Sequence, residues 1–229
     1  MFKIKFMACL ICMSLLVGCA AGTDWPKEME SKLAQLDKKG LVLSSVTFEN
    51  KLDETDSILP VSFLIGKKGE DDYEKYHFSP SQHFRVLTFD RTFYLFVLEL
   101  DPGNYSFYSM RGQIIGDMFR PLFEAPMLES FQAKKNEILY IGNIHLVLRE
   151  KASDLEHRAG PVIPLLDQAS IINATLDVKI NDEYEKDMVE FEKVFPNLKD
   201  YSVVKKILPP WRRPSPQQFE TKKTAMFFW

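Results

Sequence analysis

Histidine and carboxylate side chains are the first candidates for chemistry in this 229-residue chain, and their spacing favours no catalytic or metal site. His77, His83, His145 and His157 are scattered, and none lies in a His-Glu-x-x-His pattern, which would place two zinc ligands on one helix face. No Gly-x-Ser-x-Gly turn is present to expose a serine nucleophile. His145 lies among apolar residues of a predicted strand, where a hydrogen-bonded structural histidine is the commoner role. We therefore predict no catalytic residue, no metal and no cofactor.

Two acidic clusters could offer oxygen ligands to a hard cation. They are Asp53-Glu54-Thr55-Asp56 and Glu70-Asp71-Asp72. Neither has the spacing or the terminal glutamate of an EF-hand loop. We interpret both as solvated loop charge.

The N-terminal segment carries the strongest chemical signal. Lys3 and Lys5 precede an apolar run, 6–17, that leads into Leu16-Val17-Gly18-Cys19. This run is too short to span a bilayer, which needs ~20 apolar residues. A basic start, a short apolar stretch and small residues before a cut are typical of a secretory signal peptide. A buried N-terminal helix would explain the apolar run but neither the basic flank nor the Gly18-Cys19 ending.

Leu16-Val17-Gly18-Cys19 resembles the lipobox of bacterial lipoprotein precursors. The resemblance implies that residues 1–18 are removed and that Cys19 receives a diacylglycerol on its thiol and a fatty acid such as palmitate on its amine. Two or more such chains hold a protein firmly in a membrane. By resemblance to enterobacterial lipoproteins, the absence of aspartate at Ala20 implies anchoring in the outer membrane, facing the periplasm.

The charge and cysteine content of the cleaved chain exclude several functions. Loss of Lys3 and Lys5 reduces the 29 basic side chains to 27 against 32 acidic ones, a net charge of −5. An acidic protein has no electrostatic basis for binding nucleic acid. Cys19 would be the remaining cysteine, so we expect no disulfide and no thiolate site. The apolar core alone must then stabilise the domain, which a chain of this length allows.

A helix is predicted between Asp24 and Gly40. Met29, Leu33 and Leu36 repeat at helical spacing and form one apolar stripe. Residues 20–23 separate Cys19 from this helix and reach roughly 15 Å when extended, so we expect the domain to lie close to its membrane. We expect the stripe to pack on the domain; the alternative is a helix lying on the bilayer.

Beyond residue 40 the apolar period changes to two, which predicts strands. Turn and loop residues separate them, as in a sandwich or barrel. Gly142, inside one strand, suggests a bulge or a close backbone approach. The predicted loops are 66–81, 111–129 and 151–170. The predicted strands are 41–48, 58–65, 84–89, 93–100, 105–110, 130–133, 137–149 and 174–180.

Three segments carry a family resemblance. Leu100-Asp101-Pro102-Gly103-Asn104-Tyr105, Phe131-Gln132-Ala133 and Tyr140-Ile141-Gly142-Asn143-Ile144 resemble a pattern of prealbumin-like (carboxypeptidase-regulatory-like) β-sandwiches. The resemblance covers roughly residues 41–150 and implies an antiparallel β-sandwich. Such domains serve adhesion, binding or structural roles, so the resemblance implies little about function.

The C-terminal part is predicted to hold two helices and a tail. Asp182 and Glu185 form a candidate capping box, and 182–208 is predicted as a helical pair that packs on the sheet. The first buried stripe is Tyr184, Met188, Phe191 and Phe195; Leu198, Tyr201, Val204 and Leu208 form the second.

The tail, 209–229, is rich in proline, arginine and aromatic residues. One hypothesis is that Trp211, Arg212, Arg213 and Trp229 bind a partner or lipid headgroups, because these residue types are common in recognition. The alternative, which we favour, is that the tail wraps back and docks its terminal aromatic residues on its own domain.

We divide the chain into a signal peptide (1–18), a lipidated cysteine with tether and helix (19–40), a β-sandwich domain (41–181), a helical pair (182–208) and a tail (209–229). The expected function is a non-enzymatic structural or binding role in the cell envelope, with the membrane as one partner and an envelope protein as another. The alternatives are a component of a secretion apparatus and a carbohydrate-binding or hydrolytic envelope protein.

Overall fold

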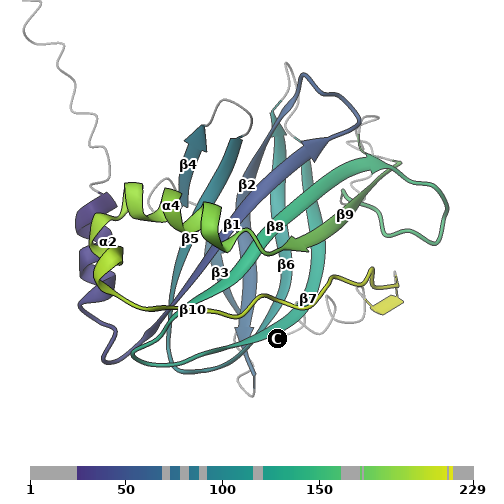
Figure 1. Ribbon diagram of the computed structural model, residues 1–229. Coiled ribbons are helices and arrows are strands. Elements are labelled where there is room, and N and C mark those ends of the chain that lie inside the picture. Colours follow the sequence, from purple (N-terminus) through teal and green to yellow (C-terminus); the bar gives the residue numbers. More distant parts are fainter. Residues whose placement is uncertain are drawn as a thin grey trace, which may run out of the picture.

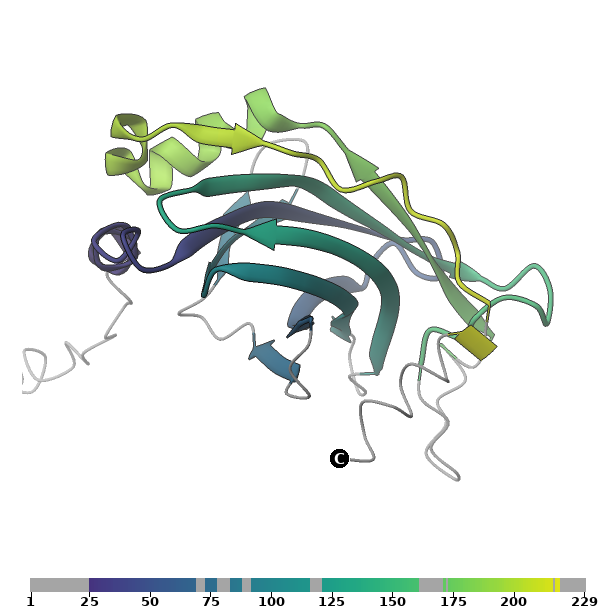
Figure 2. The ribbon, with the colours of Figure 1, turned by 90° about the horizontal axis from the view of Figure 1, so that it is seen from below.

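The computed structural model describes residues 25–68, 73–77, 83–87, 92–115, 121–160, 171, 173–215 and 217–218. Within them the chain is mainly β, with two packed sheets and helices on the outer side of one (Figures 1 and 2). None of the helices in these ranges is long and apolar enough to cross a membrane. Residues 1–18, Cys19, the cluster at 70–72 and Trp229 lie outside the described residues.

The first sheet is built around two central strands that are buried on both faces. Its strand order is β10-β8-β1-β5-β4. β9 and β10 share one edge of β8: β10 pairs with the first half of β8, and β9 pairs with the second half. The strands are β1 (Gly40–Asn50), β4 (His83–Leu87), β5 (Thr92–Leu100), β8 (Ile138–Glu150), β9 (Ala174–Asn181) and β10 (Val203–Lys205).

The second sheet has the order β3-β2-β6-β7 and is antiparallel throughout. Its strands are β2 (Ser57–Lys67), β3 (Tyr73–His77), β6 (Gly103–Ile115) and β7 (Leu122–Ala133).

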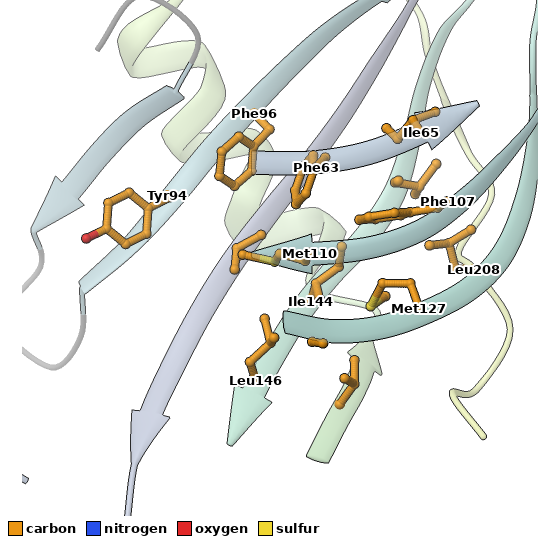
Figure 3. Close-up of a cluster of buried hydrophobic side chains, with 14 of the residues drawn as sticks. Phe63, Ile65, Tyr94, Phe96, Phe107, Met110, Met127, Ile144, Leu146 and Leu208 are labelled. Carbon is orange, nitrogen blue, oxygen red and sulfur yellow. The ribbon is translucent and has the colours of Figure 1, made fainter. Parts of the chain in front are cut away.

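An aromatic core fills the space between the two sheets (Figure 3). Phe63 of β2 is its centre, with ring centroids 4.8 Å from both Phe96 of β5 and Phe107 of β6. All three rings are at most 1% exposed. Inward-facing residues of β1, β2, β5, β6, β7, β8 and β9 contribute to this core, as strand alternation allows.

Helices cover only one end of the outer face of the first sheet. They are α2 (Trp25–Leu33), α4 (Tyr184–Val194) and the 3₁₀ helix η1 (Pro196–Asp200). Leu41 and Leu43 of β1 pack there against Met29 and Phe191. Further along β1 the outward positions become polar, at Ser45, Thr47 and Glu49, and Figure 1 shows the carboxyl ends of β1 and β8 extending past α4. The helices thus cover the apolar part of the face. Ser45 is still buried against Asp187 of α4, and exposure rises only further along, at Glu49 and His145.

A bulge at Gly142 resets the alternation of β8, as its position within the strand predicted. The pairing with β1 shifts register here: Leu43 lies opposite Tyr140, but Ser45 lies opposite Asn143. Gly142 has φ +110°, which favours glycine. Tyr140 faces outward before the bulge, and Asn143 and His145 face outward after it. Two polar side chains therefore reach the open half of the sheet.

The structure corrects the expectation of a wholly antiparallel sandwich. β1 pairs with β8 in parallel, and so does β10, so the first sheet is mixed. Turn chemistry reveals antiparallel hairpins, but pairing between strands almost 100 residues apart leaves no local signal.

Two predicted loops contain strands. β3 lies within 66–81, and β6 and β7 occupy most of 111–129. Gly112 and Pro126 favoured a loop there, yet both lie in strands. Gly112 is covered by the ring of Phe123, opposite on β7, and a Cβ at Gly112 would lie 2.1 Å from Phe123 Cζ.

The predicted helical pair is one α-helix, α4, followed by the short η1 and by β10. Met188, Phe191 and Phe195 are buried as predicted, but Tyr201 and Val204 are exposed. The predicted capping box is absent. Asp182 Oδ1 instead accepts a hydrogen bond from the backbone N–H of Tyr184 at 3.2 Å, and the N-cap, Glu183, makes no side-chain cap bond.

Candidate functional site

An open pocket of about 740 Å³ lies on the uncovered half of the first sheet. Its floor consists of outward side chains from three neighbouring strands, and its rim includes the turn between β1 and β2. The floor residues are Thr47 and Glu49 of β1, Asn143 and His145 of β8, and Lys179 and Asn181 of β9.

Strand register brings the floor side chains together in two rows. His145 lies opposite Thr47 on one side and Lys179 on the other. Asn143 lies between Ser45 and Asn181 in the same way. Directly opposed residues on one sheet face contact each other, so each row acts as a unit.

His145 contacts a hydroxyl within its row and a carboxylate, Glu49, two residues further along β1. Thr47 Oγ1 lies 2.9 Å from His145 Nδ1, and His145 Nε2 lies 3.5 Å from Glu49 Oε2. A proton on Nε2, directed at Glu49, lets Nδ1 accept the hydrogen bond from Thr47. Burial lowers the pKa of His145, Glu49 opposes this shift, and Lys179 and Lys51 add to it. The imidazole is therefore neutral at pH 7 and offers one donor and one acceptor.

The row through Asn143 continues into the protein interior. Asn181 Nδ2 donates to Asn143 Oδ1 at 3.3 Å, and Asn143 Nδ2 donates to Ser45 Oγ at 2.8 Å. Ser45 Oγ in turn donates to Asp187 Oδ2 of α4. The pocket floor is thus hydrogen-bonded to the covering helix.

Asp187 is a fully buried carboxylate beneath the pocket. Its Oδ2 also accepts a hydrogen bond from Tyr140 Oη at 2.6 Å. Burial, followed by the negative charge of Asp187, raises the pKa of Tyr140, so the phenol stays protonated and donates. Two hydroxyl donors therefore compensate for the burial of this carboxylate.

Charged side chains of both signs surround the pocket. Lys51 Nζ lies 3.4 Å from Glu49 Oε1, and Lys179, Glu54 and Asp56 complete this part of the lining.

The acidic cluster 53–56 is a turn in the structure. Asp53 Oδ1 accepts hydrogen bonds from the backbone N–H and the hydroxyl of Thr55, at 2.9 and 2.6 Å, and these bonds lower the pKa of Asp53. Across the described part of the chain, no group of three or more histidine, cysteine, aspartate and glutamate residues could hold a metal ion.

A second polar cluster fixes the first part of the tail. Arg213 forms an ion pair with Asp177 and donates to Thr175 Oγ1 at 2.7 Å. Arg149 bridges Asp177 and Glu156, at 2.5 and 2.6 Å. The hydrogen bonds from Arg149 are the largest cause lowering the pKa of Glu156 from 4.5 to about 2.

The tail residues predicted to bind a partner divide into two groups. Trp211 Nε1 donates to Pro126 O of β7 at 2.8 Å, and its ring packs against the core between the sheets. Arg213 stacks at 5.4 Å from that ring, so both side chains bind the protein's own domain. The terminal aromatic residues, whose docking was the favoured alternative, lie outside the described residues. Arg212 is exposed.

Sequence reasoning treated His145 as a structural histidine and did not find the pocket. Thr47, Glu49, Lys179 and Asn181 carry no motif, and only strand pairing brings them together with His145. A signal was present in the polar positions of otherwise apolar strands, Ser45 and Thr47 in one and Asn143 and His145 in the other. His157 is buried elsewhere, where its carbonyl accepts a hydrogen bond from Thr175.

Comparison with known proteins assigns no family. No protein-family model and no curated protein matches the chain. The crystal structure of a leucine-rich repeat protein from Bacteroides thetaiotaomicron is similar over 46% of this chain, at 12% identity and a TM-score of 0.34. The match spans 13% of that protein, and at these values it supports no conclusion about fold or function.

Proposed function

We propose that the protein is a lipoprotein of the bacterial cell envelope and that it acts as a membrane-tethered binding domain without catalytic activity. The observation that carries the binding role is the polar pocket at the end of β1, β8 and β9. At about 740 Å³ it falls within the usual range of ligand sites, ~300–1,000 Å³. Its floor side chains are held in place by hydrogen bonds within the protein, so little ordering is needed on binding.

The lipid anchor is supported by the sequence before the domain. Cys19 follows a signal-peptide-like segment with a complete lipobox, and α2 begins at Trp25. Met29, Leu33 and Leu36 are buried against the first sheet, so α2 belongs to the domain. The anchor would therefore hold the helical end of the domain near the outer membrane. The pocket lies at the other end of β1, an 11-residue strand about 35 Å long.

We further propose that the fold is a prealbumin-like sandwich. The support is the arrangement β5-β1-β8-β9 facing β3-β2-β6-β7, with one parallel pair at the centre of the first sheet. The second support is the family resemblance of the sequence around Pro102-Gly103 and Tyr140-Ile144, from which only the parallel pair departs.

Replacement of Cys19 tests the anchor. We expect Cys19→Ser to abolish incorporation of radiolabelled palmitate and to release the protein from the membrane fraction. Cys9→Ser and Cys12→Ser are matched controls, because both cysteines lie in the segment to be removed, and they should leave labelling unchanged. Palmitate incorporation that persists in Cys19→Ser would refute the proposed anchor.

The linked side chains of Thr47, His145 and Glu49 favour a second candidate function, which is hydrolysis of an ester. A neutral imidazole within hydrogen-bond reach of a hydroxyl can remove its proton as that oxygen attacks a carbonyl. Turnover of a chromogenic ester by the wild type, lost in both Thr47→Ala and His145→Gln, would favour this candidate over pure binding. Equal background hydrolysis by all three proteins would exclude it for that ester.

A further inference from the structure

We infer that the pocket takes a neutral, hydroxyl-rich ligand: a sugar or a short oligosaccharide. This inference rests on the proposed binding function and specifies its ligand class.

The floor of the pocket presents side chains that both donate and accept hydrogen bonds. Asn181 carries an amide and His145 is a neutral imidazole, and both are partly exposed; the buried Asn143 and Thr47 hold them in place. A sugar hydroxyl is also both donor and acceptor, so each contact can be made in either direction. Internal hydrogen bonds already orient these groups, which gives the specificity that a flexible polar surface lacks.

The charges around the floor disfavour ionic ligands of either sign. Glu49, Glu54 and Asp56 would repel a phosphate or a carboxylate, while Lys179 and Lys51 would repel an amine. Neutral hydroxyls meet no such penalty. They gain the stronger hydrogen bonds that form when one partner is ionised.

Two aromatic residues close the inner margin of the pocket. The rings of Phe48 and Tyr94 meet edge to face, with centroids 6.0 Å apart and an interplanar angle of 71°. Phe48 also packs against Phe123 at 6.3 Å. Both rings belong to the core between the sheets, and Tyr94 is only 2% exposed, so they hold the end of β1 in place and leave the ligand contacts to the polar floor.

Saturation-transfer NMR on the full mature chain tests the inference, because it detects weak ligands. The probes are glucose, N-acetylglucosamine and dextran, compared with phosphate, glutamate and putrescine. Phosphate has no ligand protons to observe, so its binding is followed by the line width of its phosphorus NMR signal. We expect signals from the sugars alone, and the comparison of dextran with the free sugars distinguishes a polymer from a small-molecule source.

Variants of one pocket residue link the signal to this site. Asn181→Ala should weaken sugar binding about tenfold, the effect of losing roughly 1.4 kcal/mol of hydrogen bonding. Asn197→Ala removes an exposed asparagine from η1 and should change nothing. Glu49→Gln keeps the side-chain shape but removes the charge, and should weaken binding severalfold even if Asn181→Ala is poorly folded.

The outcomes separate the inference from the proposed function. Binding of phosphate, glutamate or putrescine that depends on Asn181, without sugar binding, would overturn the sugar inference and keep the binding role. Absence of binding by every probe would overturn the inference and remove the support for a ligand-binding role. Palmitate incorporation that does not depend on Cys19 would refute the lipoprotein proposal without affecting the sugar result.

Discussion

At the scale of single residues, Asp187 shows how a buried charge positions polar groups at the surface. It joins α4 to Ser45 and Tyr140, and Ser45 in turn accepts the hydrogen bond from Asn143 on the pocket floor. This link could not be predicted from the sequence, since Asp187 lies 142 positions from Ser45. Side-chain contacts at such separations depend on the packed fold rather than on local pattern.

Asp187→Ala should lower the free energy of unfolding by about 2–4 kcal/mol, because it leaves two buried hydroxyls without their acceptor. Urea unfolding measures the change, and Asp200→Ala, at an exposed position of η1, is the matched control. A loss below about 0.5 kcal/mol, the usual scatter of surface substitutions, would contradict the prediction.

Gly142→Ala should destabilise the protein by about 1–3 kcal/mol, because φ is +110° and a side chain there is strained. A Cβ would also lie 3.2 Å from the backbone oxygen of Asn181. Thermal unfolding measures the effect. Gly103→Ala is the control, since its Cβ would meet only the flexible side chain of Lys67. Equal melting temperatures for the two variants would show that the bulge tolerates a side chain.

At the scale of elements, the open half of the first sheet exists because the apolar pattern of its outer face stops. Strands with sustained alternation or long apolar runs, β1, β2, β5, β8 and β9, could be predicted from the sequence. β6 and β7 could not be predicted in full, because Gly112 and Pro126 resemble loop residues until the partner strand is known. The second C-terminal helix was overpredicted. The spacing of its predicted stripe fits a helix, but Tyr201 and Val204 are exposed, and only Leu198 and Leu208 of the stripe are buried.

Phe191→Ala should destabilise the domain by about 3–5 kcal/mol, because this fully buried ring fixes α4 on the sheet. Val189→Ala, on the exposed side of the same helix (51% exposed), should change stability by less than about 0.5 kcal/mol. Chemical denaturation of both variants tests the difference. Similar losses in the two would mean that α4 contributes through its backbone or its polar contacts instead.

At the scale of the whole molecule, the tail joins the two sheets. Leu208 N donates to Ile141 O, Trp211 reaches β7, and Arg213 binds β9. Figure 2 shows this segment continuing from β10 along the first sheet. Composition predicted that the tail would be neither a regular helix nor a central strand, and packing then determined its route. The pocket could not be predicted from local sequence patterns either, because its floor is built by three strands that are distant in sequence.

Protonation of Glu156 at acid pH should weaken the attachment of the tail to the first sheet. Its pKa falls from 4.5 to about 2 in the folded protein, so the carboxylate contributes stability that is present above pH 4.5 and is lost as the pH falls towards 2. We expect Glu156→Gln to be less stable than the wild type at neutral pH. Between pH 4.5 and pH 2 its melting temperature should fall less than that of the wild type. Glu150→Gln, at an exposed position, should follow the wild-type pH profile. Parallel profiles for all three proteins would contradict the prediction.

The parallel pairing of β8 with both β1 and β10 also has a mechanical consequence. The described chain enters β1 beside α2, and the tail leaves towards the opposite end of the same sheet. Tension between the two ends would therefore run along the strands and load their hydrogen bonds in shear. Bonds loaded in this way share the force and break together, whereas a hairpin pulled open from one end loses its bonds one at a time. The first sheet is thus built to resist stretching along the axis that separates the helical end from the pocket.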